Sequence, residues 1–224
     1  RPFTCSNLWG ARPVQGEMSL SPEETYFLRY TLLSADLSQV WLRQVLPVLP
    51  REVDLDNEVF VVRAVTVDSA EHPWAGSSSY QELSAPFLLA QVPIPRRWTL
   101  HFASPTAFRS QDMTVPVPLP DLVFGGLLDR WNLWSPVTLN PQVRRFASER
   151  VAVGGYRLRT QALPFKGGGL QIGAVGYCRY VALSGDQYWR AMLSVLAAYA
   201  FYAGVGYQTT KGMGQARWRE DRDG

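Results

Sequence analysis

The chain has 224 residues, of which 46% are hydrophobic and 18% charged, with a formal net charge of +3. This composition supplies a hydrophobic core and excludes a disordered tail or a coiled coil, which carry more charge and less apolar mass. Residues 140–224 hold 12 of the 22 basic residues and only 5 of the 19 acidic ones, so we expect a polyanionic partner for the C-terminal part.

The first part of the chain predicts a small mixed unit. Two stretches rich in β-branched and aromatic residues are typical of strands, and one stretch with apolar residues at helical spacing predicts a helix. Ser34 or Asp36 caps the start of that helix, and Pro47 and Pro50 end it. In chain order, the expected elements are a strand at 25–33, a helix at 36–46 and a strand at 59–67.

A domain boundary is expected next. Proline, glycine and serine punctuate residues 68–96, which is typical of a linker. We therefore expect a first domain at 1–84, a linker at 85–96 and a second domain at 97–224.

The second domain predicts the order strand, helix, strand, strand, helix, strand. Trp98, Leu100 and Phe102 alternate with Thr99 and His101, so one face of the first strand is buried and His101 lies on the other. This order is ferredoxin-like, with helices on one face of the sheet only. The fold class is α+β with tandem ferredoxin-like domains, the first incomplete. The expected elements are a strand at 97–103, a helix at 121–134, a hairpin of 151–163 and 170–183, a helix at 186–203 and a strand near 215–219.

The glycine-rich loop GVGYQTTKGMG at 204–214 is the sharpest motif. It is not a Walker loop, which needs Ser or Thr after Gly-Lys, and it is not a dinucleotide fingerprint, because it follows a helix. Its composition still suits phosphate, since glycines let backbone N–H groups approach closely and the TTK segment adds donors. The candidate phosphate-binding residues are Gly204, Gly206, Thr209, Thr210, Lys211, Gly212 and Gly214.

A second basic group belongs to the predicted hairpin. Arg157 and Arg159 alternate onto one of its faces, Lys166 lies at its tip, and Arg144 and Arg145 precede it. Arginine suits bidentate phosphate contacts, so these side chains are candidates to bind a nucleic acid through its phosphates. An exposed charged hairpin without that role is the alternative, and a GC-rich genome would also favour arginine.

Other classes of site are not expected. Cys5 and Cys178 are too few for a disulfide framework or a cysteine zinc site. The acidic group at 54–58 lacks the glycine and terminal glutamate of a calcium loop and is typical of a solvated turn. No apolar run reaches about 18 residues, so no membrane span is expected. We expect a reduced, cytoplasmic protein without a metal site.

Three segments together resemble a known family. The glycine-rich loop after an apolar helix resembles the signature of the RAMP superfamily of CRISPR-associated proteins. SPTAFR at 104–109 and LLDRWN at 127–132 narrow the resemblance to the CRISPR repeat-processing endoribonucleases, the "Cas six" family. The resemblance runs from about residue 20 to 218.

The resemblance implies two ferredoxin-like domains that face each other and cut precursor CRISPR RNA once, without a metal or another cofactor. The ribose 2′-OH attacks the adjacent phosphate and leaves a 2′,3′-cyclic phosphate and a 5′-hydroxyl. This chemistry needs a base, an acid and positive charge near the phosphate. The implied partners are CRISPR repeat RNA and, further, other CRISPR-associated subunits or a fused adaptation enzyme.

The resemblance also implies an opening strand and a helix that carries the catalytic histidine. Residues 2–6 resemble the strand that comes next in the family, and no histidine precedes His72. Either the parent gene encodes a piece before Arg1, which we expect, or other residues serve. The remaining candidates for catalysis are His101, His72 and Tyr30, with Arg29 as a phosphate contact. A capping role for His72 and a plain strand-edge charge for Arg29 are the alternatives.

Two functions stay open. The first is a metal-independent endoribonuclease. The second is a RAMP-type subunit that holds CRISPR RNA in an effector or adaptation complex and cuts nothing. The glycine-rich loop fits both, SPTAFR and LLDRWN favour the nuclease, and the lack of an early histidine favours the silent subunit.

Overall fold

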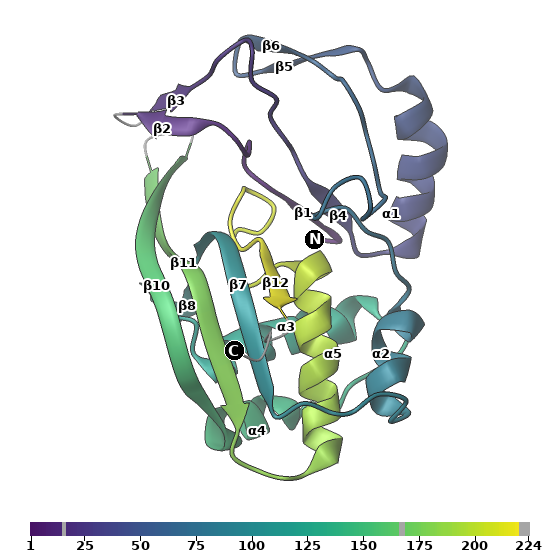
Figure 1. Cartoon of the computed structure of the whole chain (residues 1–224), viewed down its shortest axis with the longest axis vertical. Helices are drawn as coiled ribbons and strands as arrows, with labels where there is room; N and C mark the ends of the chain where they lie inside the picture. Colours follow the sequence, from purple (N-terminus) through teal and green to yellow (C-terminus); the bar gives the residue numbers. More distant parts are fainter. Residues whose placement is uncertain (15–16, 166–168, 220–224) are drawn as a thin grey trace.

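The computed structural model describes residues 1–14, 17–165 and 169–219 (Figure 1). Its centre is a four-stranded antiparallel sheet in the order β10-β11-β7-β12. The first strand of the unit thus lies between the third and the fourth, which is the ferredoxin-like arrangement and confirms the predicted fold class. The strands are β7 (Arg97–Thr106), β10 (Val151–Phe165), β11 (Gly169–Ala182) and β12 (Ala216–Arg219).

Helices cover one face of this sheet. Figure 1 shows α3 and α4 behind it and α5 beside β12. Trp98, Leu100 and Phe102 of β7 are at most 1% exposed and pack with Phe124 and Trp131 of α3, so the predicted alternation of β7 is confirmed. The helices are α3 (Pro120–Trp134), α4 (Val143–Arg150) and α5 (Gln187–Ala203), of which α3 and α5 match the prediction.

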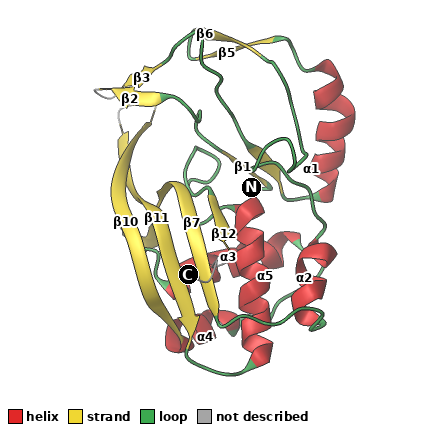
Figure 2. Ribbon diagram, viewed as in Figure 1, coloured by secondary structure: helices red, strands yellow, loops and turns green. Residues whose placement is uncertain are grey.

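The first part of the chain forms short strand pairs, in the upper half of Figure 2. The predicted strand at 2–6 is confirmed, but those at 25–33 and 59–67 shrink to three and four residues. The regular ladder of β1 ends at Cys5; Ser6 still donates its N–H to the carbonyl of Arg29 at 2.8 Å and also forms a bridge with Gly212. The pairs are β1 (Phe3–Cys5) with β4 (Tyr30–Leu32), β2 (Arg12–Val14) with β3 (Glu17–Ser19), and β5 (Glu52–Leu55) with β6 (Glu58–Val61).

The predicted helix at 36–46 is confirmed and is longer than expected. Helix α1 (Ala35–Val40) continues through a π-helical turn at Trp41–Val45 and a 3-10 turn at Leu46–Val48. Ser34, rather than Asp36, caps it by accepting a hydrogen bond from the backbone N–H of Leu37 at 3.3 Å.

The prediction of a linker over residues 68–96 is wrong for its middle part, which forms helix α2 (Tyr80–Leu88). Ser79 and Glu82 make a reciprocal capping box, with Glu82 accepting from the Ser79 N–H at 2.7 Å. The helix packs against α5, and the hydroxyl of Tyr80 donates to the carbonyl of Leu33 at 2.7 Å. The division into domains stays a prediction.

A short hairpin of β8 (Phe108–Ser110) and β9 (Met113–Val115) follows β7. No helix within the described residues is long and apolar enough to cross a membrane.

Candidate nucleic-acid interface

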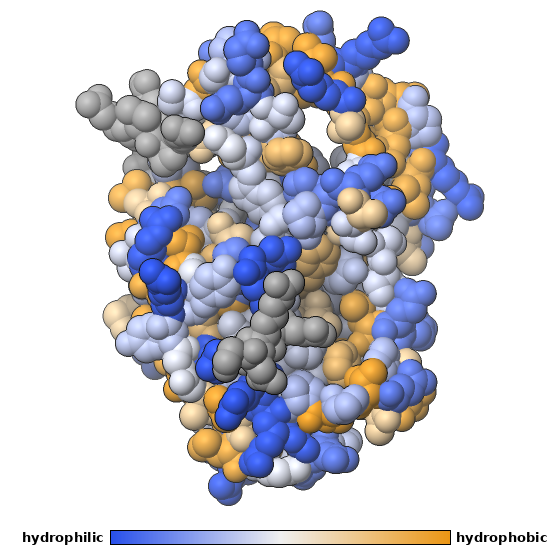
Figure 3. All heavy atoms as spheres, in the orientation of Figure 1, coloured by the Kyte–Doolittle hydropathy of each residue, from blue (hydrophilic) through white to orange (hydrophobic). Residues whose placement is uncertain are grey.

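The face of the sheet opposite the helices is rich in arginine. In the strand register, His101 lies opposite both Tyr177 and Arg217, and Tyr177 also lies opposite Arg157. Directly opposed residues of antiparallel strands point to the same face, and His101 points away from the helix-covered side. We call this surface the open face; it carries His101, Arg157, Arg159, Tyr177, Arg179, Arg217 and Arg219. In Figure 3, hydrophilic side chains gather over β10 at the left.

Two aromatic rings stack at the centre of the open face. The ring centroids of His101 and Tyr177 are 4.5 Å apart with an interplanar angle of 16°. The guanidinium carbon of Arg219 lies 5.4 Å from the Tyr177 ring centroid. Burial, together with the charges of Arg219 and Arg217, lowers the pKa of His101 to about 4, so its imidazole is neutral at pH 7.

The glycine-rich loop packs between β1 and the end of β7. The backbone N–H of Gly212 donates to the carbonyl of Cys5 at 3.1 Å, that of Tyr207 to Ala107 at 2.9 Å, and that of Gly214 to Pro105 at 3.0 Å. The N–H groups of Gly204, Val205 and Lys211 are bonded within the protein as well. The expectation that the loop offers these amides to phosphate is therefore wrong.

The glycines of this loop instead permit close backbone contact. Gly206 has φ +80°, and a Cβ there would lie 2.2 Å from the carbonyl oxygen of Ala107. Gly214 has φ +73°, and its Cβ would lie 2.1 Å from the carbonyl oxygen of Val205. The side chain of Thr209 is buried and Thr210 accepts from Arg1 at 3.2 Å, so among the predicted loop residues the exposed side chain is that of Lys211. A role of this loop in binding RNA stays a prediction.

The other two family motifs meet at the same loop. In SPTAFR, the hydroxyl of Ser104 accepts from the backbone N–H of Gln215 at 2.9 Å. In LLDRWN, Arg130 donates to the carbonyls of Ala203 at 2.8 Å and Gly204 at 2.9 Å, and also to that of Gly206. Segments far apart in the sequence thus hold one loop, a relation that their order in the chain does not reveal.

The guanidinium of Arg29 is bonded within the protein and is not a plain strand-edge charge, while its role as a phosphate contact stays a prediction. Its guanidinium donates to the carbonyl of Trp74 at 2.8 Å, to the side-chain oxygen of Gln215 at 2.7 Å and to the carbonyl of Phe201 at 2.7 Å. Burial lowers the pKa of Arg29 to about 10. These contacts join the first part of the chain to the end of α5 and to the segment directly before β12.

The structure does not bring Arg144 and Arg145 onto the open face with Arg157 and Arg159. Both belong to α4 in the helix layer, where Arg144 pairs with Asp129 at 2.6 Å and Arg145 with Glu149 at 2.8 Å. Arg157 and Arg159 are exposed on β10, as predicted from their alternation. Lys166 lies outside the described residues.

The three catalytic candidates lie on separate elements. His72 accepts from the backbone N–H of Trp74 at 3.2 Å through its Nδ1 and stacks on Phe27, which is the capping role left open above. Tyr30 is 47% exposed on β4, and burial and the neighbouring Cys5 raise its pKa to about 12. At neutral pH a phenol of that pKa donates hydrogen bonds and does not act as a base.

The sequence reasoning missed Trp74. Its ring stacks on Phe201 with 5.7 Å between centroids, lies 6.4 Å from the His101 ring and carries the guanidinium of Arg217 at 4.7 Å. An aromatic residue inside a stretch rich in proline and glycine was the available signal. Tyr177, Arg179, Arg217 and Arg219 were also missed, although alternation within β11 and β12 places them on one face.

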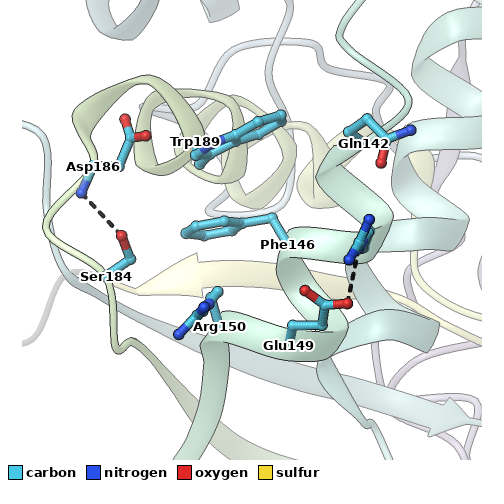
Figure 4. Close-up of a pocket in the computed structure, with 8 residues that line it drawn as sticks. Gln142, Phe146, Glu149, Arg150, Ser184, Asp186 and Trp189 are labelled. Atoms are coloured by element: carbon cyan, nitrogen blue, oxygen red, sulfur yellow. Dashed lines mark hydrogen bonds and ion pairs between the residues drawn. The ribbon is translucent and has the colours of Figure 1, made fainter.

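A pocket on the helix side offers a different chemistry (Figure 4). Phe146 of α4 stacks on Trp189 of α5 with 5.6 Å between ring centroids. The rim of this pocket mixes both signs of charge, being lined by Gln142, Arg145, Glu149, Arg150, Ser184 and Asp186. A polyanion is therefore better matched by the open face. Within the described ranges, no group of three or more His, Cys, Asp or Glu side chains is placed to hold a metal ion.

A ferredoxin-like sheet with a cationic face and aromatic side chains on its central strands defines a nucleic-acid-binding protein. The sequence profile of the family described as "CRISPR-associated endoribonuclease Cas6" matches residues 100–216. The chain belongs to this family of endoribonucleases. A search of curated protein sequences found no match.

Solved structures of the same family are similar over nearly the whole chain. The Cas6 (TTHA0078) product complex is 32% identical, with a TM-score of 0.80 over 98% of this chain and 82% of that one. The Cas6 (TTHA0078) substrate mimic complex is 32% identical, with a TM-score of 0.78 over 98% and 85%. Thermus thermophilus Cas6 (TTHB231) is 27% identical, with a TM-score of 0.74 over 97% and 79%.

We predict that Gly206→Ala destabilises the protein. The left-handed backbone and the clash with the Ala107 carbonyl cost about 2 kcal/mol or more, which lowers Tm by roughly 5 °C in a chain of this size. Gly126→Ala is the matched control, because its Cβ meets nothing within 4 Å in the interior of α3. That control should raise stability by up to about 1 kcal/mol. Thermal unfolding of both variants measures the difference; equal Tm values would contradict the packing role.

We also predict a stability dependence on pH that comes from His101. Its pKa is lowered from 6.5 to about 4 in the folded chain, so the unfolded chain binds more protons between these values. The contribution of His101 to the free energy of unfolding is therefore fully present above about pH 6.5 and is lost as the pH falls towards 4. Thermal unfolding from pH 7 to 4.5 should show a shallower decline for His101→Gln than for the wild type. Parallel curves would show that His101 is not desolvated as described.

Proposed function

We propose that this protein binds CRISPR repeat RNA across the open face and cuts it without a metal ion. Membership of the Cas6 family supports the endoribonuclease activity, and the similar structures include a product complex and a substrate mimic complex. The observation that carries the RNA contact is the set of arginines on one sheet face. Such side chains bind phosphates and release counterions when they do.

In the proposed reaction, the 2′-oxygen of a ribose forms a bond to the adjacent phosphorus. The bond from that phosphorus to the 5′-oxygen of the next nucleotide breaks. A base takes the proton of the 2′-hydroxyl, an acid gives a proton to the departing 5′-oxygen, and cations stabilise the charge on the phosphate. The products are a 2′,3′-cyclic phosphate and a 5′-hydroxyl.

A second candidate function is RNA binding without cleavage. A general base works best with a pKa near the working pH. The pKa of His101 is about 4 and that of Tyr30 about 12, so neither group is tuned to accept a proton at pH 7. These values argue against His101 and Tyr30 as the general base, while association with other CRISPR-associated subunits stays a prediction.

We predict that the product of the complete reading frame cuts labelled repeat RNA at one site in EDTA. The new 3′ end should resist a phosphatase that removes only monoesters, and the new 5′ end should accept phosphate from a polynucleotide kinase. A requirement for Mg²⁺ or a 5′-phosphate product would contradict the proposed chemistry. Tight binding with no cut would select the second function.

We predict that Arg157→Ala combined with Arg159→Ala weakens RNA binding and flattens its salt dependence. Each lost phosphate contact should reduce the slope of log K against log salt by about 1. Arg144→Ala combined with Arg145→Ala removes the same charge from the helix layer and serves as the control. Fluorescence anisotropy over a salt titration compares the two pairs. Identical slopes for both pairs would remove β10 from the interface.

A further inference from the structure

The aromatic pair at the centre of the open face, His101 and Tyr177, does not belong to the buried hydrophobic core. His101 and Tyr177 stand on β7 and β11, the two central strands of the sheet, and point away from the helices. They stack on each other with nearly parallel rings, and both are only half-buried. The buried aromatic side chains of these strands, Trp98, Phe102 and Tyr180, lie on the opposite face.

Cationic groups surround this pair on three strands. Arg157 of β10 and Arg217 of β12 are its register neighbours on either side, and the Arg219 guanidinium lies near the Tyr177 ring. Arg179 follows Tyr177 two positions later on the same face. Along the described paired positions of this face, the strands carry no Asp or Glu side chain. An aromatic surface ringed by guanidinium groups suits a ligand with both a flat ring and a phosphate.

A paired RNA stem does not use such a surface. The bases of an A-form helix are stacked inside it, and proteins bind it through phosphates and 2′-hydroxyls. An unpaired nucleotide exposes its base, which stacks on aromatic side chains of a sheet while basic groups hold the backbone. The arginines alone would serve either kind of RNA, but the ring pair distinguishes between them.

We propose that the His101–Tyr177 pair is a stacking site for an unpaired nucleotide of the bound RNA, with its phosphate held by the neighbouring arginines. The inference rests on the proposed binding of repeat RNA and assigns this surface to a single-stranded segment rather than to a stem. The neutral state of His101 agrees with it, because an uncharged imidazole stacks without adding repulsion among the arginines.

The test compares two RNAs of equal length, an unstructured oligonucleotide and a blunt hairpin without flanking nucleotides. Tyr177→Ala should weaken binding of the oligonucleotide about tenfold, since the variant loses the stacking of a base on an aromatic ring. Its binding of the hairpin should change less than twofold, and Tyr177→Phe should keep wild-type affinity for both. Tyr156→Ala is the control, because that tyrosine is 74% exposed on the adjacent strand and lies opposite Cys178, outside the open face.

A spectroscopic readout separates stacking from a structural effect. An oligonucleotide with 2-aminopurine at successive positions should lose fluorescence on binding at the stacked position, and Tyr177→Ala should restore that fluorescence at saturating protein. Equal loss of affinity for both RNAs, or unchanged quenching in Tyr177→Ala, would overturn the stacking site. This outcome is distinct from failure of the proposed function, in which the wild type would neither bind nor cut repeat RNA.

Discussion

The carboxyl end of α5 is the point on which the rest of the structure depends. The last carbonyls of a helix have no partner within it, and they carry the negative end of its dipole. Here two arginines from distant segments bind them. Arg29 donates to Phe201, and Arg130 donates to Ala203 and Gly204.

These arginines connect parts that the chain does not place together. Arg29 also binds the carbonyl of Trp74 and the side chain of Gln215, and its guanidinium carbon lies 4.4 Å from the centroid of the Phe201 ring. Its bonded acceptors are neutral oxygens. The helix dipole and the aromatic rings therefore stabilise a charge that would otherwise be costly to enclose. The bonds of Arg29 therefore fix the position of the first part of the chain relative to α5 and to the segment before β12.

The glycines of the loop at 204–214, which belong to the family signature, serve the packing of the protein. Gly206 and Gly214 allow backbone to lie against backbone, and Ser104 and Arg130 hold the loop from two sides. A motif of this kind identifies a family reliably because no other residue fits the space. It does not show where the ligand lies, since its polar groups are largely bonded within the protein.

How far the sequence predicts this fold depends on the range of each interaction. The long helices and the hairpin follow from strong periodicity over many residues, and the alternation of β7 correctly placed His101 on the face without helices. The strands of the first part are three or four residues long, and contacts with distant segments, such as the bridge between Ser6 and Gly212, add to their short ladders. Helix α2 was not predicted, because Pro86 lies within it and several serines precede it. The spacing of Ser79 and Glu82 nevertheless matches a capping box, which indicates the start of a helix.

The candidate site was predictable only where side-chain direction follows from a simple period. Alternation placed Arg157 and Arg159 correctly. Charge alone assigned Arg29, Arg144 and Arg145 to the same task, although one is enclosed and two form ion pairs on the helix side. The charge of a side chain does not predict which way that side chain points in the folded protein. The fold decides whether it meets a helix end, a carboxylate or solvent.

The open face concentrates positive charge, part of which is stabilised by aromatic rings, with Arg217 over Trp74 and Arg219 near Tyr177. Its arginines come from β10, β11 and β12, and the strands supply no acidic partner at the described paired positions of that face. Burial is the main cause that lowers the pKa of His101, and the charges of Arg219 and Arg217 lower it further because they disfavour the protonated imidazole. The pKa of Arg217 is itself lowered by burial and by Arg219. A potential that repels a proton attracts phosphate for the same reason, and a bound polyanion relieves the repulsion among the arginines. The charge of this face therefore supports the proposal that RNA phosphates bind there.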